Sequence, residues 1–161
     1  MSPESVGFGI YVKLLDDAAS QGTLATRAWL ERYPRGIAWL YATFELEGQV
    51  YNGGFHQYFW NTGGALLDIA VTGYEHFDCP RHVQLARRAA RIAGRELDAS
   101  RSDEFSDVRG FLQAFHDSEV ASTLLPIDTE WYALDDAENA DERRDAAIGR
   151  EPMLYTRDRR D

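Results

Sequence analysis

The sequence is poor in cysteine and in long apolar runs. Its 161 residues include one cysteine, Cys79, so the chain cannot form an internal disulfide, and a lone thiol suits a reducing compartment. No basic cluster precedes the short apolar run at the start, which argues against a signal peptide. No stretch approaches the roughly 18 uninterrupted apolar residues of a membrane span. These absences predict a cytoplasmic, bacterial-type protein that does not bind membranes.

Basic residues are missing from one long segment. The formal net charge is -10, and residues 96–161 carry all of it, with eighteen acidic against eight basic residues, while residues 1–95 carry nine of each. No basic residue lies between Arg109 and Arg143, where nine acids occur. Such a field repels nucleic acid and attracts basic partners, although it can also serve solubility alone. The predicted partner-binding residues are these nine acids: Asp117, Glu119, Asp128, Glu130, Asp135, Asp136, Glu138, Asp141 and Glu142.

Familiar catalytic signatures are missing as well. The chain has no G-x-S-x-G elbow, no phosphate-binding P-loop and no H-E-x-x-H zinc motif. Among its four histidines, His116 with Glu119 could place two ligands on one helix face, but one pair makes no metal site. Cys79 precedes Pro80 and has no adjacent base in sequence, which disfavours a catalytic thiol. We therefore predict no metal, no cofactor and no catalytic residue.

A basic stripe stands out in the first half. Four arginines recur at helical spacing, with no acid between Arg81 and Glu96: Arg87, Arg88, Arg91 and Arg95. The stripe could bind an anion or phosphate. The overall charge favours the other reading, a solvated helix face that pairs with the acidic half of the chain.

Apolar periodicity predicts a single compact all-α domain over residues 1–161. The expected helices cover about 11–18, 23–34, 37–51, 54–62, 67–77, 80–93, 108–115, 128–134 and a polar stretch from 139. The helix from 37 has little polar surface and should be central. Asp128 could cap the short helix after it, and Asn139 with Glu142 has the spacing of a capping box. The tail at 150–161 is either mobile or docked through Met153, Leu154 and Tyr155.

The stretch QVYNGGFHQYFWNTGG at 49–64 combines glycines, amides and aromatics. Its glycines should break the chain at Asn52-Gly53-Gly54 and end the next helix at Gly63-Gly64. That helix lacks an ordinary polar face, which predicts burial within the chain or in a subunit interface. Asn52, Gln57 and Asn61 are then expected to be buried hydrogen-bond partners for helix ends, because amides are poor general acids or bases. The stretch is interpreted as architecture.

The same stretch resembles the N-G-G-F-x-Q-Y/F-F-x-N signature of a bacterial domain family whose best-known member is a DNA-mimic protein. The residues that carry the resemblance are Asn52, Gly53, Gly54, Phe55, Gln57, Tyr58, Phe59 and Asn61. A looser similarity covers about 10–135, and Tyr51 departs from an expected second asparagine. The resemblance implies a helical fold, homodimers, no catalysis, and an acidic surface that imitates DNA phosphates. The signature carries the fold, whereas the mimicking acids lie outside it.

Three functions are compatible with these features. The first is a DNA mimic that occupies a basic DNA-binding protein, for example a helix-turn-helix regulator. Two acid series have the helical spacing that approximates neighbouring phosphates, namely Asp135–Glu138–Glu142 and Asp128–Glu130–Asp135. The second is an immunity or antitoxin-like protein that plugs a basic toxin. The third is a small enzyme with a pocket formed by His56, Gln57 and Asn61.

Overall fold

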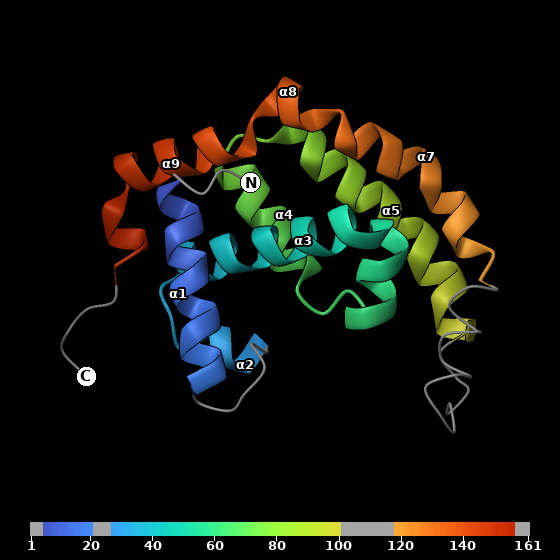
Figure 1. The fold of residues 1–161 in the computed structure, drawn as a ribbon, viewed down its shortest axis with the longest axis horizontal. Helices are drawn as coiled ribbons and strands as arrows, with labels where there is room; N and C mark the ends of the chain where they lie inside the picture. Colours follow the sequence, from blue (N-terminus) through green and yellow to red (C-terminus); the bar gives the residue numbers. More distant parts are fainter. Residues whose placement is uncertain (1–4, 21–26, 101–117, 157–161) are drawn as a thin grey trace.

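Helices form all of the regular secondary structure in the residues that the computed structural model describes, which are 5–20, 27–100 and 118–156 (Figure 1). This confirms the all-α prediction. None of the described helices is long and apolar enough to cross a lipid bilayer. In chain order the elements are α1 (Val6–Ser20), α2 (Arg27–Leu30), α3 (Arg35–Thr62), α4 (Leu67–His76), α5 (Pro80–Ser100), α7 (Val120–Tyr132), α8 (Leu134–Glu138), α9 (Ala140–Arg150) and the short 3-10 helix η1 (Pro152–Leu154).

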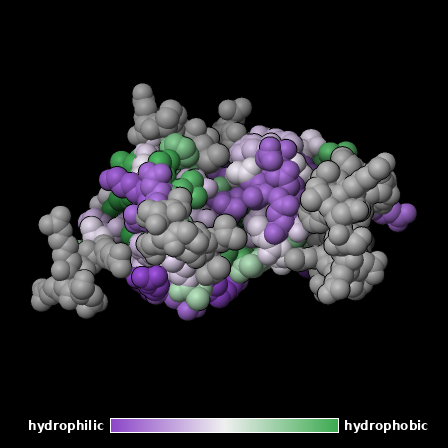
Figure 2. Space-filling view, turned by 60° about the horizontal axis from the view of Figure 1, so that its bottom comes forward, coloured by the Kyte–Doolittle hydropathy of each residue, from purple (hydrophilic) through white to green (hydrophobic). Residues whose placement is uncertain are grey.

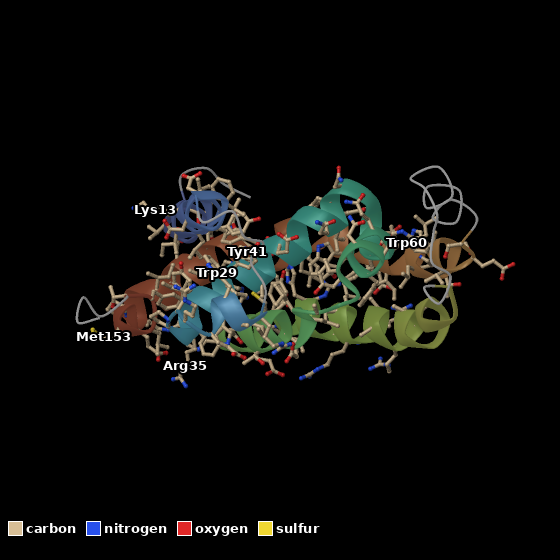
Figure 3. The ribbon with its side chains drawn as sticks, turned by 90° about the horizontal axis from the view of Figure 1, so that it is seen from below. Lys13, Trp29, Arg35, Tyr41, Trp60 and Met153 are labelled. Carbon is tan, nitrogen blue, oxygen red and sulfur yellow. The ribbon has the colours of Figure 1, made fainter. Side chains whose placement is uncertain are left out.

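Helix α3 crosses the middle of the molecule and packs against α1, α4, α5 and α7. Its first half is apolar around most of its circumference, and Leu40, Phe44, Leu46 and Val50 have no exposed surface. Burying a side chain of this size contributes about 1.5–3 kcal/mol. The predicted central helix is therefore confirmed. Figure 3 shows Trp29 of α2 close to Tyr41 of α3, while Lys13, Arg35 and Met153 lie at the periphery.

The signature glycines divide α3 into two helices. Gly53 is extended (φ -166°, ψ 30°), and Gly54 has φ 73° and ψ 178°, a conformation that side-chain-bearing residues rarely adopt. The second half ends at Gly63, whose backbone is left-handed (φ 61°) and whose N–H bonds to the carbonyl of Phe59. Both the predicted break and the predicted end are confirmed.

Helices α7, α8 and α9 form an arch along one edge of the molecule, and α7 lies beside α5 (Figure 1). Two local predictions are wrong here. Helix α5 does not stop at Gly94 but continues to Ser100, and Asp128 lies inside α7 rather than at the start of a short helix that follows it. The capping role of Asn139 is confirmed, since its side chain accepts a hydrogen bond from Glu142 N–H. The helix expected at 108–115 lies outside the described residues.

The described part of the tail, up to residue 156, docks against the protein. Tyr155 is buried, and Leu154 is partly buried, while Met153 is 78% exposed. The docking surface includes Gly36 at the start of α3, because a Cβ there would lie 2.6 Å from the Leu154 carbonyl and 2.7 Å from the Tyr155 ring. Residues 157–161 lie outside the described part.

Candidate functional site in the acidic segment

The nine predicted partner-binding acids lie in residues 117–142, here called the acidic segment, and they occupy different environments. Asp117 lies outside the described residues, and the side chains of Asp135 and Asp136 are not described although their backbone belongs to α8. Of the remaining six, two are buried, one is partly buried and three are exposed. Asp128 and Glu138 are buried, Asp141 is partly buried, and Glu119, Glu130 and Glu142 are exposed.

Asp128 points into the protein and caps the second half of α3. It is 6% exposed, and its Oδ1 accepts a hydrogen bond of 2.8 Å from the Phe55 N–H, the first donor after the Gly54 break. Burial raises the pKa of the Asp128 carboxyl, and the bond from Phe55 partly opposes that shift. The expectation that Asp128 belongs to the partner surface is corrected. Its carboxylate satisfies a helix end left open by the glycines.

Glu138 has a similar internal role at the start of α5. Its carboxylate accepts hydrogen bonds from Arg81 N–H (2.7 Å) and His82 N–H (3.2 Å), and it lies 2.5 Å from His82 Nδ1. Burial acts to raise the Glu138 pKa, but these hydrogen bonds outweigh it and lower the pKa overall. Glu138 is therefore a buried cap rather than a surface acid. Each of the two series with phosphate-like spacing loses one member, Glu138 from one and Asp128 from the other.

Arginines neutralise several exposed acids. Arg88 of the basic stripe pairs with Glu130 of the acidic segment at 2.7 Å, as expected for a solvated face that pairs with the acidic half, whereas Arg87 pairs with Glu75 at 2.6 Å. Both pairs are about half exposed and contribute about 0–1 kcal/mol each. Their main effect is on charge. A partner's cation that approached Glu130 would compete with Arg88.

A buried ion pair that sequence reasoning missed joins α9 to α3. Arg144 is fully buried and pairs with Glu47, which also accepts a 2.9 Å hydrogen bond from the Tyr74 hydroxyl. Its guanidinium lies 4.2 Å from the Phe44 ring centroid and bonds to Asp141 at 3.0 Å. Burial opposes the charge, but neighbouring Glu47 holds the Arg144 pKa above its usual value. Asp141 thus completes an internal network, and no local pattern in the sequence marks Arg144 as buried.

The signature amides lie at the surface, which corrects the expectation that they are buried at helix ends. Asn52 and Asn61 are exposed, and Gln57 is partly buried. Gln57 Nε2 and Asn61 Nδ2 both donate to Gln49 Oε1, at 3.0 and 2.9 Å. Gln49 in turn donates to Glu45. Figure 2 shows that hydrophilic side chains gather in a patch on one face of the molecule. The amides bridge the glycine break on its outer side.

The alternative enzyme pocket requires His56, Gln57 and Asn61 to face a common space. His56 is only 5% exposed and lies beside the Trp60 ring, with 5.6 Å between centroids. The two amides instead turn outward to Gln49. The structure therefore places the three side chains in different environments, with the His56 ring buried and the two amides bonded to Gln49.

The fold and the site define a class: an all-helical domain with an acid-rich arch, in which some acids cap internal helices and others face solvent. The model of the DMP19-like protein family matches residues 31–149, and the chain belongs to that family. The resemblance carried by the signature is thereby confirmed, although the match begins and ends later than the expected 10–135. Membership suggests a DNA-mimic protein. No curated protein and no solved structure matches the chain.

Proposed function

We propose that the protein is a DNA mimic that occupies a basic DNA-binding protein, such as a helix-turn-helix regulator, through the acidic segment. The observation that carries the proposal is membership of the DMP19-like family. The exposed carboxylates on the α7–α9 arch support it, and in the described part these are Glu119, Glu130 and Glu142. The proposal also includes Asp117, Asp135 and Asp136, whose side chains lie outside the described part.

The buried caps would contribute to this function indirectly. Asp128 fixes α7 against α3, and Glu138 fixes the end of α8 against α5, so the backbone that carries the exposed acids is held rigid. A rigid array of negative charge attracts lysines and arginines that normally bind phosphates, and it loses little conformational freedom on binding. Such an interaction should weaken with salt.

The test uses the purified chain as bait in a native lysate, followed by elution with rising salt. A captured protein is identified, and its binding to its own DNA is measured with and without the mimic. A triple variant, Glu119→Gln, Glu130→Gln and Glu142→Gln, is compared with a charge-matched control, Asp16→Asn, Glu31→Gln and Asp68→Asn. Each set neutralises three exposed carboxylates, one of them paired with an arginine (Glu130 with Arg88, Asp68 with Arg27).

If the proposal is right, the arch variant loses about 2–3 kcal/mol of binding, which is roughly 30–150-fold in Kd, while the control binds nearly as the wild type does. Equal losses in both variants would mean that only net charge matters. A captured protein that does not bind DNA and stays bound to the bait at high salt would instead support an immunity-type plug with buried anchors.

A further inference from the structure

Three side chains with metal-binding chemistry meet where the start of α5 faces the end of α8. Cys79 and His82 lie one helical turn apart, and Glu138 approaches them from the opposite side. One ligand atom from each residue, namely the thiol sulfur, a ring nitrogen and a carboxylate oxygen, lies within 4.8 Å of the other two. All three residues are buried, with exposures of 0%, 2% and 6%. They are called the Cys79–His82–Glu138 cluster below.

The backbone around the cluster is specialised. In the described part of the chain, the two non-glycine residues with positive φ are Asp78 (59°) and Asn139 (44°), which directly precede Cys79 and directly follow Glu138. Asp and Asn tolerate this conformation better than other residues. Arg143 ties the two turns together, because it donates to the Asp78 carbonyl and carboxylate and, through Nε, to the Glu138 carbonyl at 2.6 Å. The ligand-bearing segments are thus held in register by contacts that do not use the ligands.

We propose that the cluster is a binding site for one thiophilic divalent cation of the zinc class. A thiolate and an imidazole select zinc-like ions over magnesium and calcium, which prefer oxygen ligands alone. A tetrahedral zinc with bonds of 2.0–2.3 Å separates its ligand atoms by about 3.3–3.8 Å. Nδ1 of His82 and the Glu138 oxygen are 2.5 Å apart and must separate by about 1 Å to bind zinc. The Cys79 sulfur lies within 4.8 Å of both atoms and must move closer to them by at most about 1 Å.

The charge balance of the cluster favours a bound dication. Without the cation, an ionised Cys79 and an ionised Glu138 would leave two negative charges buried. On binding, the Cys79 S–H bond breaks and its proton goes to solvent, while a neutral His82 ring nitrogen donates its lone pair. If Nδ1 is the ligand, the proton of the neutral ring is carried by Nε2. The cation, the thiolate and the carboxylate then form a neutral group, which avoids the cost of an uncompensated buried charge. Water supplies the fourth ligand.

The consequence is a cross-link between α5 and α8. Cys79 and His82 belong to the turn before α5 and its first turn, whereas Glu138 ends α8, so the ion would fix one end of the arch that carries the acidic segment. This inference does not depend on DNA mimicry. It concerns the stability and rigidity of the domain whatever its partner is.

The experiment uses the untagged full chain, first dialysed against a chelator and then equilibrated with buffered zinc. Bound metal is measured by mass spectrometry, and cobalt replaces zinc in a parallel sample so that sulfur-to-cobalt charge-transfer absorption reports a thiolate ligand. Cys79→Ser removes one ligand. His76→Gln is the matched control, because His76 also lies three residues from Cys79 but does not belong to the cluster.

We expect one zinc per wild-type chain, the charge-transfer band with cobalt, and a rise in Tm on zinc addition. Cys79→Ser should bind zinc at least about 100-fold more weakly, because the loss of an outer-shell partner alone weakens metal binding by up to about 100-fold. The variant should also lose the charge-transfer band. The His76→Gln control should keep all three properties. Absence of zinc uptake or of the band in folded wild-type protein overturns the proposal without requiring any variant. Retention of zinc by Cys79→Ser overturns it equally.

Discussion

Replacing Gly54 with alanine should be among the most damaging single-methyl changes in this protein. The native backbone there has φ 73° and ψ 178°, which costs a side-chain-bearing residue about 1–3 kcal/mol. An added Cβ would also collide with the Asp128 carboxylate, whose Cγ would lie 2.9 Å away. Moving that carboxylate breaks its bond to Phe55 N–H, a loss of about 1–2 kcal/mol. The expected destabilisation is about 2–5 kcal/mol.

Two other glycines provide matched controls. Gly53→Ala should cost less, because Gly53 has an extended backbone and the three atoms nearest to a Cβ there all belong to the Gln57 side chain, whose amide end can move. Gly48→Ala should stabilise the protein by about 0.5–1 kcal/mol, because it lies within a helix and an added Cβ meets nothing within 4 Å.

Urea unfolding followed by far-UV circular dichroism measures all three variants. With a slope of about 2 kcal/mol/M, the Gly54→Ala midpoint should fall by about 1–2.5 M. The double variant Gly54→Ala with Asp128→Ala has neither the cap nor the collision. Its loss of stability should therefore be smaller than the sum of the losses in the two single variants. A Gly54→Ala midpoint no lower than that of Gly53→Ala would contradict this prediction, and so would strict additivity.

The remaining predictions concern three other contacts. Asp128→Asn keeps an acceptor and removes a buried charge, so it should be neutral or stabilising at pH 7, whereas Asp128→Ala should lose about 1–2 kcal/mol. Because the Asp128 pKa is raised in the folded state, its charge penalty applies above that pKa and vanishes below the unfolded value near 3.8. The advantage of Asp128→Asn should therefore shrink as pH falls from 7 toward 3.5, measured by unfolding midpoints. Glu47→Gln leaves Arg144 buried without its main counter-charge and should cost about 3–5 kcal/mol in the same assay, unlike an exposed-pair variant. Gly36→Ala should displace Tyr155, detected as faster proteolysis of the tail with the remaining helices intact.

Local features were predictable from the sequence because the forces behind them are local. The break at Gly53–Gly54 and the end at Gly63 follow from glycine's access to positive φ, and Asn139 caps a donor only three residues away. Hydrophobic periodicity located most of the described helices and identified the apolar α3 as central, but the helix expected at 128–134 begins at Val120. The predicted end of α5 at Gly94 was wrong, because glycine lowers helix propensity by about 1 kcal/mol but does not by itself end a helix.

The roles of the acids were not predictable, because each role depends on a partner far away in the chain. Asp128 and Phe55 are 73 residues apart, and Glu138 and His82 are 56 apart. Nothing near either acid marks it as buried. The spacing of Cys79 and His82 was a local signal for a metal site. The third ligand, Glu138, comes from α8, so the pair alone could not define the site.

The internal roles of these acids change what the net charge means. A carboxylate that caps a buried helix end or pairs with a buried arginine contributes to folding, and it is not available to a lysine or arginine on the surface of a partner protein. In the described part of the acidic segment, Asp128, Glu138 and Asp141 are used in this way, and Glu130 is shared with Arg88. Any imitation of DNA must therefore come from the placement of a few exposed carboxylates on the arch, since the size of the charge excess does not measure it. Partner selectivity would then follow from that placement, because partners differ more in the geometry of their basic residues than in their number.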